Sequence, residues 1–308
     1  MMASRVAILA GLMLSASGWL SAPMALAAGI LIGLILGNPW ATHTGRASKI
    51  LLQAAVVGLG FGLALDEIWR TGRIGLLLTI LVISAALAAG FWLGRLLSVP
   101  DKTSRLISVG TAICGGSAIA AIAPILRAND DEVGAALATV FTLNAAGLFL
   151  FPRLGALLGL GQVEFGYWAA LAIHDTSSVV AAGSVYGATA LGVATTVKLT
   201  RAAWIAPVAL AWAALNRSGE KARFPWFIAG FVLAALVRTM FPAQEAAWSF
   251  LVSAARYLLV IILFLIGTGM TRKLLSSVGV RPLLHGFLLW LLVATTMLLV
   301  IRAIPLPV

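Results

Sequence analysis

Charged residues are scarce in this sequence. Only 10% of its 308 residues are charged and 61% are hydrophobic, whereas soluble domains carry about 25% charged residues. This composition excludes an ordinary soluble globular protein and indicates an integral membrane protein.

Cysteine and acidic residues are also rare. The single cysteine, Cys114, cannot form a disulfide within the chain, so it is either a small core residue or a functional thiol. The 10 acidic residues are outnumbered by 21 basic ones, which occur singly or in small groups between apolar runs. That distribution is typical of loops flanking membrane helices, and no nucleic-acid-binding motif accompanies it. We therefore expect the lipid bilayer as a partner and no nucleic acid.

Long apolar runs divide the chain into eleven candidate membrane spans. They lie at residues 6–22, 24–38, 50–65, 74–97, 106–126, 133–158, 165–186, 189–214, 226–240, 247–270 and 283–304. The first also resembles a signal peptide, but its apolar run continues directly into the second, so we expect a retained extra helix. The sequence predicts one all-α transmembrane domain, residues 1–308, with about eleven helices. Basic residues concentrate in alternate loops, which places the N-terminus in the cytoplasm and the C-terminus on the periplasmic or external side.

Segments two to six and seven to eleven form two sets of five helices, residues 24–158 and 165–304. Because five is odd, the two sets have opposite orientations, and we predict two inverted five-helix repeats. The fourth helix of each set carries glycine and hydroxyl residues, which predicts two crossing discontinuous helices. These residues are Cys114, Gly115, Gly116 and Ser117 in one set, and Gly267, Thr268 and Gly269 in the other. The alternative is that these small residues permit close helix packing.

A helix break inside a membrane favours a binding site. Unpaired backbone groups are costly in lipid, so irregular backbone is tolerated only where it lines a cavity or is covered by protein. Exposed amides at the start of a half-helix bind anions, and glycine lets a ligand approach them closely. We predict a substrate site at the two glycine-containing stretches.

Ionisable residues inside the apolar segments sharpen this prediction. His174 and Asp175 lie near the middle of the seventh segment, Lys198 and Arg201 lie in the eighth, and Arg256 lies in the tenth. Charges at such depth normally face a cavity or a partner and mark a substrate or proton path. Three cations against one carboxylate favour an anionic ligand. Alternatively, Asp175 pairs with a cation as a purely structural contact, Arg256 snorkels to the interface, and His174 is a hydrogen-bonded core residue.

Three acidic residues follow the sequence LRAN. Asp130, Asp131 and Glu132 precede the sixth apolar segment. Acidic residues suit the first turn of a helix, so we predict a solvated N-terminal cap there.

Several motifs together resemble the YeiH-type sulfate exporters of bacteria. They are SKILLQAAVVGLGFGLAL, GTAICGGSAIAAIAPILRA, IHDTSSVVAAG, VKLTRAAWIAP and GTGMTRKLLSSVGVRPLLHG. The resemblance covers most of the chain and implies a bacterial inner-membrane protein related in fold to sodium/proton antiporters and bile-acid symporters. It implies transport of a small anion more strongly than it implies sulfate. Asp175 stands where the family often has a carboxylate after the histidine.

Our hypothesis is a secondary transporter that moves a small anion, such as sulfate or an organosulfonate, by alternating access. Lys198, Arg201 and Arg256 neutralise the substrate in this scheme, and His174 and Asp175 carry a coupling proton. One alternative is a cation/proton antiporter that uses Asp175, which the excess of buried cations disfavours. Another is a membrane enzyme with a Cys114 nucleophile and a His174 base. We expect no cofactor or metal. Coupling to protons or sodium, and a homodimer, stay open.

Overall fold

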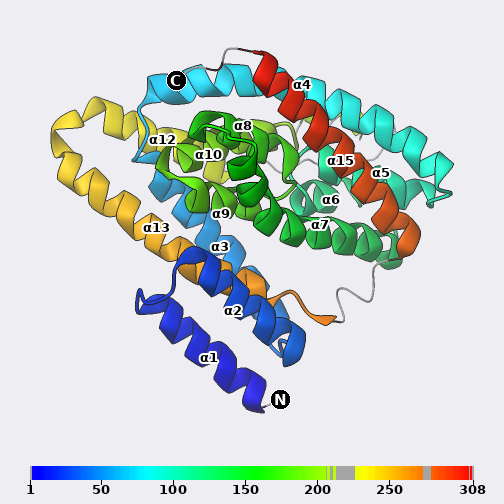
Figure 1. Ribbon diagram of the computed structural model, residues 1–308, viewed down its shortest axis with the longest axis horizontal. Helices are drawn as coiled ribbons and strands as arrows, with labels where there is room; N and C mark the ends of the chain where they lie inside the picture. The colour runs from blue at the N-terminus through cyan, green and yellow to red at the C-terminus, as the bar shows by residue number, and fades with distance from the viewer. Residues whose placement is uncertain are drawn as a thin grey trace. The chain divides into compact units, whose positions relative to one another are not determined.

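The computed structural model describes residues 2–205, 207–208, 211–212, 226–272, 279–304 and 306 (Figure 1). These residues form helices joined by short connections, and no strand occurs among them. The helices are α1 (Met2–Ala16), α2 (Ala22–Ile35), α3 (Ala41–Gly60), α4 (Leu65–Leu96), α5 (Asp101–Ala112), α6 (Gly116–Ile122), α7 (Asp130–Leu157), α8 (Gln162–Ala172), α9 (Thr176–Tyr186), α10 (Ala188–Ala203), α12 (Trp226–Met240), η1 (Pro242–Gln244), α13 (Glu245–Thr268) and α15 (Val280–Ala303).

Four of the described helical stretches are long and apolar enough to cross a membrane. They are α4, α7, η1 continued by α13, and α15; α1, α12 and most of α2 are shorter apolar helices. The prediction of an all-helical membrane protein is confirmed. The count of eleven spans and the inverted repeats stay predictions, because four of the described helices are both long and apolar enough to span and two predicted segments are each divided into a pair of shorter helices.

The helices group into two compact units. One comprises Met1–Ile68 and Trp226–Ser276, and the other comprises Trp69–Pro225 and Ser277–Val308. Each unit draws segments from both halves of the chain. We call them the α13 unit and the α10 unit, after one helix of each.

Helices α2 and α13 approach so closely in the α13 unit that their backbones touch. A Cβ atom at Gly29 would lie 2.3 Å from the carbonyl oxygen of Phe264, and one at Gly267 would lie 2.6 Å from that of Leu26. Any side chain at these two positions would therefore push the helices apart. Close packing of small residues is a usual means of associating helices in membranes.

The helix break and substrate site predicted at Gly267, Thr268 and Gly269 stay predictions, and the packing of this stretch is as follows. Helix α13 is continuous from Glu245 to Thr268, and Gly269 is its C-terminal cap. The stretch ends α13, Arg272 is helical again, and residues 273–278 lie outside the described residues. The side chain of Thr268 is buried and accepts a hydrogen bond of 3.1 Å from Asn38 Nδ2. Gly267 lies against the backbone of α2, which is the close helix packing that we gave as the alternative role of these small residues.

The α10 unit contains α5 to α10, α15 and nearly all of α4. Helix α10 packs against both α8 and α9, and α7 packs against α5, α6 and α9 (Figure 1). The predicted span at residues 106–126 is divided into α5 and α6, and the span at residues 165–186 into α8 and α9. Both divisions fall inside this unit.

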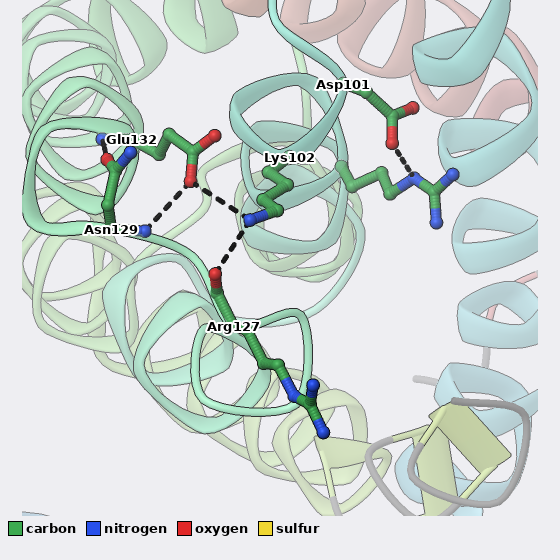
Figure 2. A network of polar contacts seen from close by, with 6 residues as sticks. Asp101, Lys102, Arg127, Asn129 and Glu132 are labelled. Carbon is green, nitrogen blue, oxygen red and sulfur yellow. Dashed lines mark hydrogen bonds and ion pairs between the residues drawn. The ribbon is translucent and has the colours of Figure 1, made fainter. Parts of the chain in front are cut away.

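The predicted cap before the sixth segment is confirmed. Asn129 caps α7: its Oδ1 accepts from the Glu132 amide at 2.8 Å, and Glu132 Oε2 accepts from the Asn129 amide at 2.8 Å (Figure 2). Asp130, Asp131 and Glu132 supply negative charge to the first turn, where the helix dipole favours it. This reciprocal pair fixes where α7 begins.

Candidate functional site: two helix breaks that meet

The first break lies between α5 and α6. Helix α5 ends at Ala112, Ile113 has φ −118° and ψ −88°, and α6 starts at Gly116. Gly115 has φ +66° and ψ −129°, a conformation that side-chain-bearing residues rarely adopt. The interruption predicted at Cys114–Ser117 is therefore present, and Gly115 is the residue that makes it sterically acceptable.

The second break lies between α8 and α9, in a segment that we predicted to be one continuous span. Ile173 is extended at φ −80° and ψ 132°, and Asp175 is the N-cap of α9. Asp175 Oδ2 accepts from the amides of Ser177 at 3.0 Å and Ser178 at 3.3 Å. The sequence signal was present, because an aspartate followed by Thr-Ser-Ser is typical of a helix start.

Asn144 of α7 braces the second break from outside. Its Oδ1 accepts from the backbone amides of His174 at 3.1 Å and Asp175 at 3.3 Å. Those two amides stand in the gap between α8 and α9, where the helices themselves supply no acceptor for them. Sequence reasoning missed Asn144, which is a single polar residue in an apolar helix and is 4% exposed. Buried amide side chains in membrane segments commonly satisfy broken backbone in this way.

The two breaks face each other. A Cβ atom at Gly115 would lie 3.5 Å from both the backbone nitrogen and the Cα of Asp175. The gap between α5 and α6 therefore contacts the N-cap of α9. Two interrupted helices that meet at their interruptions bring four helix ends together, two C-terminal and two N-terminal.

Lys198 of α10 contacts the C-terminal ends of both α5 and α8. Its Nζ donates to the carbonyl oxygens of Ile173 at 2.7 Å, Ala170 at 3.4 Å and Ile113 at 3.4 Å. The last carbonyls of a helix have no partner within it and carry partial negative charge. A fully buried ammonium group therefore satisfies carbonyls from both breaks.

Arg201 does the same one turn further along α10. Its Nε donates to the Ala112 carbonyl at 2.7 Å, one terminal nitrogen donates to Leu171 and to Ala170 at 3.3 Å, and the other donates to Thr111. The guanidinium is fully buried. Its planar fork spans the ends of α5 and α8 with three nitrogens, so it reaches four carbonyls at once.

These contacts give Lys198 and Arg201 partners that the sequence did not predict. We expected them to neutralise a ligand or to pair with Asp175. In the described residues their hydrogen bonds go to backbone carbonyls, while the carboxylate of Asp175 accepts from the amides of α9. Their first role is to hold two helix ends together.

Several buried polar atoms at the breaks have no hydrogen-bond partner among the described residues. They are both ring nitrogens of His174, the Nδ2 of Asn144 and the hydroxyl of Thr111. Each of these residues is less than 5% exposed. Unsatisfied buried polar groups cost free energy, so a cluster of them indicates a place where water, an ion or a substrate completes the bonding.

The remaining predicted site residues lie in different settings. Cys114 is 2% exposed within the first break, and Ser117, in the first turn of α6, is exposed. His174 makes no hydrogen bond to the Cys114 thiol, the contact that the enzyme hypothesis requires. Arg256 is exposed on α13, in the α13 unit together with Gly267, Thr268 and Gly269.

Comparison with known proteins gives one family. A family model described as conserved hypothetical protein 698 matches residues 1–286. The chain is 52% identical over 291 residues to a UPF0324 membrane protein of Geobacter sulfurreducens, covering 94% of each chain. It is 47% identical over 286 residues to a UPF0324 membrane protein of Porphyromonas gingivalis, covering 90% of this chain and 86% of the relative. No solved structure matches.

Proposed function

The chain belongs to this family of UPF0324 membrane proteins, and we propose that it is a secondary transporter whose substrate binds where the two helix breaks meet. The observation that carries the proposal is the meeting of Gly115 with Asp175, with Lys198 and Arg201 closing the helix ends around it. Crossing interrupted helices are a recurrent device for binding substrates and coupling ions at the middle of a transporter. A merely structural protein gains nothing from two breaks that need two buried cations to satisfy them.

We propose that the substrate is a small anion, such as sulfate or an organosulfonate. Four half-helix ends meet here, and the cations offset the partial negative charge of the two C-terminal ends together with the charge of Asp175. What is left for a ligand is the Asn144 Nδ2 donor and the imidazole of His174, which donates from one nitrogen when neutral and from both when protonated. With the ring protonated, this set of donors suits an oxyanion better than a metal cation.

His174 is our candidate for the coupling proton. Its ring is 1% exposed and unpartnered among the described residues, and Asp175 follows it directly. A histidine can take up a proton near physiological pH and would then donate from both nitrogens. Proton uptake would thus accompany anion binding. Sodium coupling, and a cation/proton antiporter that uses Asp175, are the alternatives that transport measurements separate.

Transport into proteoliposomes tests this function. We expect uptake of labelled sulfate or methanesulfonate, dependent on a proton gradient, and little exchange of sodium for protons. Asn144→Leu, which removes both the brace and the free donor, should abolish uptake. Thr142→Ala is the matched control, because that half-buried hydroxyl on the same helix donates only to the Ala138 carbonyl. Sodium/proton exchange without anion uptake would support the antiporter instead.

We propose further that the protein lies in the bacterial inner membrane with its N-terminus in the cytoplasm. The basic residues that support this orientation include Arg217, Lys221 and Arg223, which lie outside the described residues. The C-terminal Val308 lies outside them too. Reporter fusions after Val308 should be active only when the reporter requires the periplasm. A cytoplasmic C-terminus would show that the number of spans is even.

A further inference from the structure

A second polar site lies in the α10 unit, apart from the helix breaks. A cavity of about 620 Å³ opens beside the end of α4 and the start of α5. Its apolar wall includes Leu87, Phe91 and Trp212, and its polar wall includes Arg95, Ser104 and Arg105. The volume is within the range of small-molecule sites. The cavity therefore joins an apolar wall to a polar wall that carries two arginines and one carboxylate, Asp101.

The basic residues of this neighbourhood differ in whether their charge is already used. Arg105 Nε lies 2.9 Å from Asp101 Oδ2, and Lys102 Nζ donates to the Arg127 carbonyl at 2.8 Å and lies 3.8 Å from Glu132 (Figure 2). Both cations are thus partnered within the protein.

Arg95 is the exception. Its guanidinium carbon lies 4.1 Å from the centre of the Phe91 ring, and no carboxylate of the described residues pairs with it. Stacking on an aromatic ring holds the plane of the guanidinium but leaves the donors at its edge available. A positioned arginine fork with free donors matches the two acceptor oxygens of a phosphate group.

The position of the cavity along α4 indicates where its ligand comes from. Helix α4 is long and apolar enough to span the membrane, and Arg95 is in its last turn. The neighbouring Trp92 and Leu96 are 68% and 78% exposed. A tryptophan and a leucine exposed beside a basic residue at a span end are typical of the region between headgroups and acyl chains.

We propose that this cavity binds the headgroup of an anionic phospholipid, with the phosphodiester on Arg95 and the start of an acyl chain on Leu87 and Phe91. A free oxyanion would use the arginine but not the apolar wall. Basic pockets between membrane helices on the cytoplasmic side commonly take anionic lipids. This site is independent of the proposed transport function and would tune the stability of the α10 unit according to the lipid around it.

Thermal unfolding of the full-length protein in detergent tests the site. Phosphatidylglycerol should raise the melting temperature more than phosphatidylcholine does, by an amount that grows with lipid concentration. Arg95→Gln should weaken the apparent affinity for phosphatidylglycerol about tenfold, the loss expected for a charge-assisted hydrogen bond. Arg153→Gln is the matched control, because Arg153 is an exposed arginine of the same unit that does not line the cavity.

Three outcomes would overturn the proposal. They are equal stabilisation by the two lipids, an unchanged response of Arg95→Gln, and an equal stabilisation by inorganic phosphate alone, which would make the cavity a site for a dissolved anion. If Arg95→Gln folds poorly, native mass spectrometry of Arg95→Lys decides. That variant keeps the charge but lacks the fork, so it should retain fewer phosphatidylglycerol molecules than the wild type; equal retention would contradict the arrangement.

Discussion

Two stretches of nearly the same composition have different surroundings. Cys114–Ser117 lies between α5 and α6 and faces a second helix break, whereas Gly267–Gly269 forms the C-terminal end and cap of α13 and packs against the continuous helix α2. Each contains two glycines and a hydroxyl residue. Glycine content alone therefore does not distinguish a helix break from a site of close packing between helices.

The neighbours of each stretch decide the outcome. Gly115 has a positive φ and stands against the backbone of a second break, whose carbonyls are held by buried cations. Gly267 stands against the unbroken backbone of α2, next to Leu26, Gly29 and Ile30. A helix breaks in the membrane only where something else takes up its hydrogen bonds.

The largest effect on stability is expected from removing Lys198 or Arg201, the two cations that bind the carbonyls at the helix breaks. Arg201→Met removes the side-chain donor to the carbonyls of Thr111, Ala112 and Leu171, and hydrogen bonds to charged groups contribute about 1.5–3 kcal/mol each. We expect loss of most folded protein, measured by monodisperse yield and melting temperature. Lys198→Met should lower the melting temperature less severely, because two of its three contacts are 3.4 Å long.

Two further variants sharpen this test. Arg256→Met removes an exposed arginine of α13 and should change stability by about 0.5 kcal/mol or less. Asp175→Asn should not restore the stability of Lys198→Met, because the lysine's partners are carbonyls. Full rescue would mean that the two charges form a pair, and an unchanged Arg201→Met would contradict the role of the carbonyl contacts.

The glycines of the two stretches should separate function from stability. Gly115→Ala forces a residue with a side chain to adopt a positive φ, at a cost of about 1–3 kcal/mol, and should abolish transport by moving the break. Gly267→Ala meets the Leu26 carbonyl at 2.6 Å and should cost about 1–3 kcal/mol as overpacking. Its transport per folded molecule should persist. Thermal unfolding and uptake measured on the same preparations check both.

Gly134→Ala is the matched control for both variants. It lies inside α7, and a Cβ atom there meets nothing within 4 Å, so helix propensity should raise stability by up to about 1 kcal/mol. If Gly267→Ala abolishes transport while the protein remains fully folded, the stretch has a role in the substrate path that close packing does not explain.

Sequence reasoning succeeded where the signal was local. The break at Cys114–Ser117, the acidic first turn at Asp130–Glu132 and the burial of Lys198 follow from residue type and its immediate neighbours. The break between α8 and α9 was missed, because a hydropathy pattern says nothing about which helix tolerates a gap. The partners of Lys198 and Arg201 were out of reach, since a backbone carbonyl carries no signature in the sequence.

The smallest effect is expected at Cys114, which distinguishes a transporter from an enzyme. Its thiol is buried in the first break, and the ring nitrogens of His174 have no hydrogen bond to it. Cys114→Ala removes one sulfur atom from a tight site, so the melting temperature should fall by only a few degrees and uptake should stay above about half. Cys114→Ser, which keeps the volume, should retain more. A thiolate nucleophile would instead lose essentially all activity in both variants. Loss of all uptake in a folded Cys114→Ala protein would contradict the view that Cys114 is only a small packing residue. It would support the alternative in which Cys114 is a nucleophile.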